Sequence, residues 1–228
     1  KYKRKILVSI FVNPKQFNKR DDYKSYPRNI SSDIKKLNKA NVDYLYIPSF
    51  KDVYEFKTKK KVFLDKFSKK LCGKNRKGHF KGVVEVVNRF LEIIKPRFIF
   101  LGLKDFQQLY LIKKHILIRK IKTKVIECKI IREKNGVACS SRNFNLSNKQ
   151  KIIAADIYNY FSKLKKKLKK TDIFSQRNKL KKILLNLGAN KIDYVVNYNI
   201  KDLKTSNTTN KNSKIFVAYY IKKVRLID

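Results

Sequence analysis

The chain has 228 residues, 43% of them hydrophobic, and 58 Lys and Arg against 17 Asp and Glu give it a formal net charge of +41. Its length suits one domain plus a small one, and its 15 Phe and 13 Tyr argue against intrinsic disorder. With no apolar run near the roughly 20 residues of a membrane helix, no signal peptide and three unevenly spaced Cys, we expect a cytoplasmic protein without a membrane partner.

The first part of the chain alternates strand and helix patterns. The expected elements are, in chain order, a strand over residues 6–12, a helix from Ser31–Asp33, a strand over residues 42–47, a basic loop over 73–78, a helix from Val83 to Ile94, a strand over 97–101, a helix with Leu109, Ile112 and Ile116, and a strand around Val125. Short apolar runs predict buried strands, and apolar residues three or four apart predict helices. The alternation predicts an α/β fold with a parallel sheet and crossover helices.

The pattern changes after Glu133. Asn135-Gly136 predicts a hairpin turn, and two helices follow over residues 148–169 and 176–187, the second closed by Gly188. The last expected elements are an antiparallel pair of strands over residues 192–196 and 215–221, with a mobile polar loop over residues 204–213 between them. We therefore divide the chain into a domain of residues 1–133 and a small α+β domain of residues 134–228.

Two polar segments follow or precede expected elements of the first domain. Asn13 and Gln16 come directly after the first strand, where ligands of open α/β sheets bind, and their amides suit a small substrate with hydroxyl and carboxylate groups. Gly73 to Phe80 is a glycine-bracketed basic segment at a helix start, able to hold an anion on backbone amides. The alternatives are an ordinary turn and a structural role for His79.

Two further segments offer groups for phosphates. Gly102 to Gln108 lies between a buried strand and a helix, and it combines a glycine with the cation of Lys104. Ala138 to Asn143 contains two hydroxyls and an Arg in a row. The alternatives are a helix capped by Asp105 and a polar interdomain loop.

Metal and nucleic-acid sites have less support. The Cys residues and the two His lack ligand spacing, so we expect no protein-held metal and interpret each Cys as a small buried hydrophobe. Lys163 to Lys170 is the strongest nucleic-acid candidate, but Leu164 and Leu168 at helical spacing favour a solvated helix face. Lys, Ile and Asn dominate the composition, a bias typical of AT-rich codons, which favours drift over a selected nucleic-acid surface as the source of the charge.

Taken in order, these segments resemble the pantothenate synthetase (pantoate–β-alanine ligase) family over nearly the whole chain. The segments that carry the resemblance are Ser9–Phe17, Tyr26–Arg28, Gly78–Phe80 with Gly82-Val83, Gly102–Gln108, Arg132-Glu133, Ser140–Asn143 and Arg225–Asp228. The resemblance implies a Rossmann-like nucleotidyltransferase domain. It also implies an ATP-dependent ligase that forms pantoyl adenylate and pyrophosphate, then pantothenate and AMP, with Mg²⁺ accompanying the ATP and a homodimer as the assembly.

The resemblance also implies roles for individual residues. Gln16 would bind pantoate near the β-alanine site, Gln108 would also hold pantoate, and Asn13 would support them. The residues expected to contact ATP are Gly102, Leu103, Lys104, Asp105, Ile131, Cys139, Ser140, Ser141 and Arg142. Lys104, Ser140, Ser141 and Arg142 are the expected catalytic residues, since they can neutralise charge that develops as pyrophosphate leaves.

Three positions depart from the family pattern. Leu103 stands where the family has an acidic residue, Cys139 where it usually has Met or Leu, and Lys129 where it usually has Pro. The family also carries a Met-x-x-Leu-His-x-Gly-His segment upstream of the first motif, so we expect the first βα unit to be missing here and an apolar sheet surface to be exposed. We expect this chain alone to be poorly active and poorly stable. Two alternatives stay open: a remnant without catalysis, and a basic nucleic-acid-binding protein.

Overall fold

The chain folds into two units whose segments interleave along the sequence. The computed structural model describes residues 4–18, 20–167, 177–207 and 212–228. Unit 1 consists of Lys1–Lys69, Arg76–Phe100 and Gln108–Ile126, and unit 2 consists of Lys70–Asn75, Leu101–Gln107 and Glu127–Asp228. Residues 134–228 thus lie within unit 2, which also takes in three short segments from the preceding part of the chain. Each unit is described below by itself.

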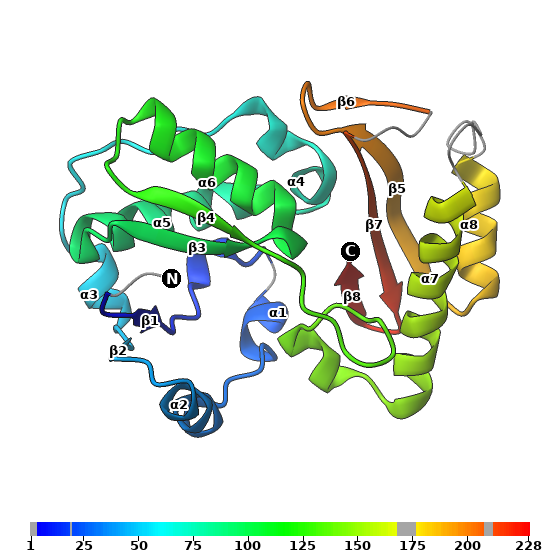
Figure 1. The fold of residues 1–228 in the computed structure, drawn as a ribbon, viewed down its shortest axis with the longest axis horizontal. Coiled ribbons are helices and arrows are strands. Elements are labelled where there is room, and N and C mark those ends of the chain that lie inside the picture. Colours follow the sequence, from blue (N-terminus) through cyan, green and yellow to red (C-terminus); the bar gives the residue numbers. More distant parts are fainter. Residues whose placement is uncertain (1–3, 19, 168–176, 208–211) are drawn as a thin grey trace. The chain divides into compact units, whose positions relative to one another are not determined.

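Unit 1 is an α/β unit with two small sheets (Figure 1). In chain order its elements are β1 (Leu7–Ser9), the 3₁₀ helix η1 (Pro14–Gln16), α1 (Arg20–Lys24), α2 (Ile30–Lys39), β2 (Tyr44–Tyr46), α3 (Phe50–Tyr54), the 3₁₀ helix η2 (Lys66–Lys69), α5 (His79–Ile94), β3 (Phe98–Gly102), α6 (Phe106–Ile118) and β4 (Lys124–Cys128). Two residues at one end of each of the last three elements belong to unit 2: the last two of β3 and β4 and the first two of α6. β1 pairs in parallel with β2 in the register Leu7 to Tyr44, and β3 and β4 form the second sheet.

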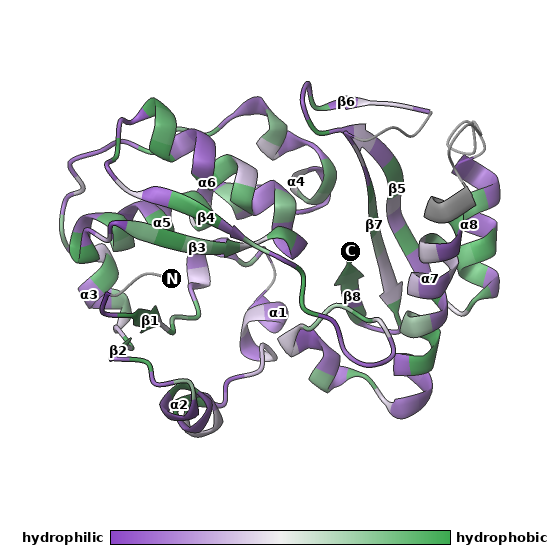
Figure 2. Cartoon of the chain, in the orientation of Figure 1, coloured by the Kyte–Doolittle hydropathy of each residue, from purple (hydrophilic) through white to green (hydrophobic). Residues whose placement is uncertain are grey.

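The core of unit 1 is built on α5 and α6. Apolar residues recur at helical spacing on both helices, and the most buried of them are Val83, Val84, Leu91, Leu109, Leu111 and Ile112. In Figure 2 the strand β3 is coloured mostly hydrophobic, whereas the helices carry both hydrophobic and hydrophilic stretches. Leu7, Tyr44 and Phe100 of its strands are exposed.

A buried histidine joins α6 to α5. His115 is fully buried, its Nδ1 accepts from the Phe63 backbone N–H at 3.1 Å, and its Nε2 lies 2.9 Å from Asn88 Oδ1. Nδ1 is therefore the unprotonated nitrogen, and Nε2–H donates to the amide oxygen. Burial lowers the pKa of His115 to about 4, so the ring is neutral near pH 7.

Unit 2 is organised around a four-stranded antiparallel sheet with the order β6-β5-β7-β8. Its elements are α4 (Leu71–Asn75), the 3₁₀ helices η3 (Leu103–Asp105) and η4 (Ser141–Asn145), α7 (Asn148–Lys167), α8 (Arg177–Asn186), β5 (Lys191–Asn199), β6 (Lys204–Thr205), β7 (Ser213–Ile221) and β8 (Val224–Ile227). α8 ends in a Schellman motif: Gly188 has φ +104°, and the N–H of Ala189 donates to the Leu184 carbonyl at 3.0 Å.

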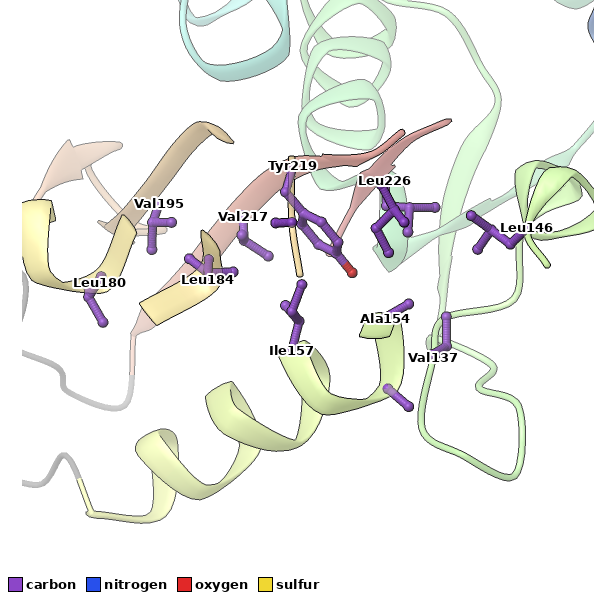
Figure 3. Packing of buried hydrophobic residues seen from close by; sticks show 13 residues of the cluster. Val137, Leu146, Ala154, Ile157, Leu180, Leu184, Val195, Val217, Tyr219 and Leu226 are labelled. Carbon is purple, nitrogen blue, oxygen red and sulfur yellow. The ribbon is translucent and has the colours of Figure 1, made fainter. Parts of the chain in front are cut away.

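One hydrophobic cluster packs α7 and α8 on this sheet. Figure 3 shows Ala154, Ile157, Leu180 and Leu184 of the helices beside side chains of the sheet. The cluster consists of Val137, Leu146, Ala154, Ala155, Ile157, Leu180, Leu184, Ala189, Val195, Val217, Tyr219, Ile221 and Leu226. Leu164 packs against it from the last part of α7. Among the helices that the structure describes, none has the length and hydropathy needed to cross a bilayer.

The fold class is confirmed, whereas several boundaries differ from the sequence-based predictions. The strand predicted over residues 6–12 is only Leu7–Ser9, because the chain leaves β2 after the Ile10 N–H bonds to the Tyr46 carbonyl. The helix predicted from Ser31 begins at Ile30, because the Asn29 side chain caps it by accepting from the Ser32 N–H at 3.0 Å.

Three more expectations need correction. Part of the loop expected over residues 73–78 is helical, since Gly73 is buried inside α4. Cys72 is buried as expected, but Cys128 is only partly buried and Cys139 is exposed. Of the loop expected over residues 204–213, Lys204-Thr205 form β6, and residues 208–211 lie outside the described residues, as do residues 168–170 of the lysine-rich run.

Candidate functional site

Asn13 holds the turn that follows β1. Its side chain is 1% exposed, and Nδ2 donates to the Gly82 carbonyl at 3.1 Å. Oδ1 accepts from the Lys15 N–H at 3.2 Å and from the Tyr54 hydroxyl at 3.0 Å. Burial and the charge of Glu85 raise the pKa of Tyr54 to about 12, so its hydroxyl stays protonated and donates. The Asn13 amide is thus engaged within the protein, which suits the supporting role expected of it.

Gln16 ends η1 and is held by its backbone. Its carbonyl accepts from His79 Nδ1 at 2.7 Å, and Arg76 Nη1 donates to His79 Nε2 at 3.0 Å. Both ring nitrogens of His79 are therefore engaged in positioning Gln16, in line with the structural alternative for this residue. Within the described ranges no hydrogen bond ties the Gln16 side-chain amide to the chain, and the residue is half-buried.

Gly82 allows α5 to approach η1 closely. A Cβ atom at Gly82 would contact the Lys15 carbonyl oxygen and lie 2.9 Å from Gln16 Cα, closer than side chains allow. The glycine in Gly82-Val83 is therefore needed for packing, and it sets the position of the backbone that carries Gln16. Gln108 lies in the first turn of α6 and is half-buried, and its amide likewise has no hydrogen bond to the part of the chain described.

Unit 2 contains the segment Gly102–Asp105, which runs from the end of β3 through η3. Lys104 is mostly buried, with 18% of its side chain exposed, and its Nζ lies 3.7 Å from the half-exposed Asp105 carboxylate. Gly102 has φ −74°, and a Cβ there would meet nothing within 4 Å. Neither backbone strain nor packing within the chain therefore requires glycine at this position.

The other expected ATP contacts of unit 2 lie on the hairpin around Gly136. Ile131 is 71% exposed, and its carbonyl accepts from the Cys139 N–H at 2.9 Å, so these two residues are neighbours. Ser140 begins η4 by accepting the Arg142 N–H on its Oγ at 3.3 Å. Arg142 Nη1 donates to the Arg225 carbonyl at 3.2 Å. The hairpin thus brings together Ile131, Cys139, Ser140 and Arg142.

One charged pair fixes this hairpin to the end of the chain. Arg132 donates to both carboxylate oxygens of Asp228, at 2.6 and 2.8 Å, and also to the Gly136 carbonyl. Asn143 Nδ2 donates to Glu133 Oε1 at 2.7 Å. Sequence reasoning gave Arg132, Glu133 and Asp228 no role of their own, although their place in the shared motifs was a usable signal.

No preformed metal centre is present in the residues described, since no three or more His, Cys, Asp or Glu side chains come together there. A metal that enters with a nucleotide needs fewer protein ligands, because Mg²⁺ is usually bound by one or two carboxylates together with phosphate oxygens and water. The half-exposed Asp105 is the carboxylate of the segment Gly102–Asp105, so the donor set fits an ion held mainly by phosphates.

Comparisons with known proteins agree on one family. The family model described as pantoate-beta-alanine ligase matches residues 1–228. The chain is 38% identical over 226 residues to the pantothenate synthetase of Flavobacterium psychrophilum, a match that covers 97% of this chain and 80% of the relative.

Solved structures are similar over almost the whole chain. One is the pantoate-beta-alanine ligase of Francisella tularensis complexed with beta-gamma ATP and beta-alanine, with 37% identity, a TM-score of 0.81, and coverage of 99% of this chain and 78% of that one. Another is the pantothenate synthetase of Thermus thermophilus, with 27% identity, a TM-score of 0.85, and coverage of 98% and 82%.

Proposed function

Because the chain belongs to the pantoate-beta-alanine ligase family, we propose that it joins pantoate to β-alanine at the expense of ATP. The observation that carries the proposal is the match over residues 1–228, within which the polar segments at the strand ends keep their order. The similar ligase of Francisella tularensis is complexed with beta-gamma ATP and beta-alanine in its crystal structure, which supports ATP and β-alanine as ligands here.

The proposed reaction has two steps. A carboxylate oxygen of pantoate attacks the α-phosphorus of ATP, and the bond to the departing pyrophosphate breaks. The amine of β-alanine then attacks the acyl carbon of pantoyl adenylate, the bond to AMP breaks, and the nitrogen loses a proton. Adenylation supplies a good leaving group, and holding the amine beside the acyl carbon supplies much of the remaining rate.

In this proposal the two amides of unit 1 recognise pantoate. Gln16 and Gln108 both have side-chain amides without hydrogen bonds to the described parts of the chain, so they are able to bind hydroxyl and carboxylate groups of a substrate. Gln16 is also our candidate for the residue next to β-alanine. Asn13 acts through its bonds to Lys15 and Gly82, which fix the η1 backbone.

In unit 2, the segments Gly102–Asp105 and Cys139–Arg142 are the proposed nucleotide contacts. Lys104 and Arg142 supply cations, and Ser140 and Ser141 supply hydroxyls, for charge that develops on the phosphates. Since the chain itself does not need glycine at Gly102, close approach of the nucleotide is our explanation for it. Leu103 and the exposed Ile131 and Cys139 complete the proposed contacts.

We propose Asp105 as the protein ligand of a Mg²⁺ ion that accompanies ATP. When bound, the ion would neutralise phosphate charge. Lys104, whose Nζ lies 3.7 Å from the Asp105 carboxylate, is the proposed cation beside the same phosphates. A homodimer in the cytoplasm is the proposed state of the protein, supported by its family. Sedimentation equilibrium tests the homodimer. Twice the mass of one chain would support it, and the monomer mass alone would contradict it.

The direct test of this function is release of AMP that requires both pantoate and β-alanine. We expect AMP release to disappear when either acid is omitted. No AMP release with all three substrates present would contradict the function and favour a remnant without catalysis.

A second candidate function is binding of nucleic acid. Unit 1 carries a concave basic surface of about 410 Å³, lined by Lys59, Lys60, Lys61, Ile118, Arg119 and Lys120. Binding of RNA there predicts an affinity that falls steeply with salt concentration and weakens when Lys60, Lys61 and Lys120 are changed to Gln. An equal effect of three Lys→Gln changes on α2 and α7 would indicate that the total charge is responsible.

A further inference from the structure

Arg225 is a buried cation in a chain rich in exposed ones. Of 58 basic residues in the sequence, it is the only one buried within the described parts of the chain. Its Nε donates to Asp193 Oδ2 at 2.7 Å, and the two side chains are 8% and 6% exposed. Its two terminal nitrogens lie 3.6 and 3.7 Å from the Sγ of Cys72. Taking a charge out of water is costly, so a buried pair of this kind calls for an explanation.

A bulge in β5 directs two consecutive side chains to this cation. Side chains alternate between the faces of a regular strand, so Asp193 and Tyr194 would point to opposite sides. The pairing of β5 with β7 shifts between Ile192 and Tyr194, which leaves Asp193 unpaired. Asp193 therefore reaches Arg225, while the Tyr194 hydroxyl lies 3.0 Å from Cys72 Sγ, and burial together with Cys72 raises the pKa of Tyr194.

Cys72 links this cluster to the proposed nucleotide segment. The Cys72 N–H donates to Gln107 Oε1 at 3.1 Å, and Gln107 Nε2 donates to the Lys70 carbonyl at 2.8 Å. Leu71, between these two contacts, has a φ of +44°, which is unfavourable for a non-glycine residue. A side chain at the end of the segment Gly102–Gln107 thus holds a strained backbone next to Cys72.

Arg225 also contacts the second proposed nucleotide segment, Cys139–Arg142. The Arg225 carbonyl accepts from Arg142 Nη1 at 3.2 Å. The Arg225 side chain contacts Cys72, whose N–H bonds to Gln107 at the end of the first segment. The Arg225 backbone contacts Arg142 directly. Both connections lie within unit 2.

We propose that Arg225, with Asp193, Tyr194 and Cys72, is a positioning cluster that fixes the segment Gly102–Gln107 relative to Arg142 for binding ATP. The proposal rests on the ligase function above and extends it to residues that need not touch any substrate. Loosening the cluster displaces Lys104 from Arg142, so it weakens use of ATP and leaves recognition of β-alanine unchanged.

The test compares substitutions that remove a few side-chain atoms inside the cluster with matched substitutions outside it. Tyr194→Phe and Cys72→Ala each remove one contacting group, whereas Cys72→Ser keeps a polar atom. Tyr219→Phe, at a buried tyrosine of the hydrophobic cluster, and Cys128→Ala are the controls. The readouts are the KM for ATP and the KM for β-alanine in steady-state ligation, and the Kd of a non-hydrolysable ATP analogue by calorimetry.

We expect Tyr194→Phe to raise the KM and Kd for the nucleotide about three- to tenfold, as for the loss of one hydrogen bond. Cys72→Ala removes contacts to both Tyr194 and Arg225 and should raise them at least as much. The KM for β-alanine should stay within about twofold, Cys72→Ser should recover most of the loss, and both controls should match the wild type.

Variants that lose stability while nucleotide KM and Kd stay unchanged would overturn the proposal and leave the cluster a structural one. Equal changes in the KM for β-alanine would do the same. Arg225→Lys, which keeps the charge but not the forked geometry, should reproduce the loss if it folds, and Tyr194→Phe decides if it does not. A wild-type chain that binds the ATP analogue but never ligates refutes the proposed function, whereas a ligating wild type with unaffected variants refutes only the cluster.

Discussion

The two units differ in one buried charge. Both bury neutral polar residues to 1% exposure or less: Asn13, Asn88 and His115 in unit 1, and Asn197 in unit 2. Among the described residues, unit 2 alone also buries a Lys or Arg cation, that of Arg225, which pairs with Asp193. Neutral networks are lost when a neutral group becomes charged, whereas ion pairs are lost when one charge is removed. The units should therefore respond to different perturbations.

The largest effect is expected from breaking the buried ion pair of unit 2. Asp193→Asn removes the carboxylate and leaves the buried Arg225 cation without its counter-charge. We expect the free energy of unfolding to fall by about 3–5 kcal/mol, measured by urea denaturation. A loss below about 1 kcal/mol would mean that this pair matters no more than a surface pair.

Acid should act on unit 1 through His115. Its pKa is about 4 in the folded protein, and about 6.5 is expected for an unfolded chain. Between these values the unfolded state binds the proton and the folded state does not, so stability falls as the pH decreases, by about 3 kcal/mol in total.

The control for acid is His115→Gln. Urea titrations at several pH values give the free energy of unfolding of each protein. The wild type should lose about 3 kcal/mol more than the variant between pH 7 and pH 4. Parallel pH profiles would rule out His115 as the source.

Gly82→Ala should cost unit 1 about 1–3 kcal/mol, because the new Cβ meets the backbone of Lys15 and Gln16. Gly102→Ala is the matched change, since its Cβ meets nothing within 4 Å. We expect thermal unfolding to show a lower Tm for Gly82→Ala and an unchanged Tm for Gly102→Ala, with weaker ATP binding in the second case. Equal Tm losses would mean that the close approach at Gly82 is not specific.

The smallest effect is expected at an exposed pair. The Lys36 Nζ lies 3.8 Å from the Asp33 carboxylate on α2, with 65% of the Lys36 side chain and 43% of the Asp33 side chain exposed. Asp33→Asn should change the free energy of unfolding by less than about 0.5 kcal/mol. A change as large as that of Asp193→Asn would contradict the view that burial determines what an ion pair contributes here.

Periodicity predicted the helices of this fold better than its strands. The spacing of Val83, Val84 and Leu91 predicted α5, whose backbone bonds are local to the helix. β1 depends on its partner β2, and nothing local in residues 6–12 shows where that pairing stops. A missed helix, α3, had a readable signal, since Ser49 and Asp52 form a capping box.

The candidate site was likewise predictable from the sequence only where its residues lie close together along the chain. Polar residues next to apolar runs predicted the segments that follow strands. The order of these segments along the chain indicated the family. The contacts of Arg225 with Cys72 and of Arg132 with Asp228 join residues 153 and 96 positions apart. No local pattern predicts such pairs, because they depend on how the strands of unit 2 meet α4 and the hairpin around Gly136.

The first step proposed for this chain is activation of pantoate by adenylation. Exchange of labelled pyrophosphate into ATP reports that step alone, because it does not need β-alanine. We expect exchange that requires pantoate and that falls roughly 10²- to 10³-fold in Lys104→Ala, which removes a cation from the proposed phosphate site. Exchange that is absent from the wild type, or that proceeds equally without pantoate, would contradict the claim.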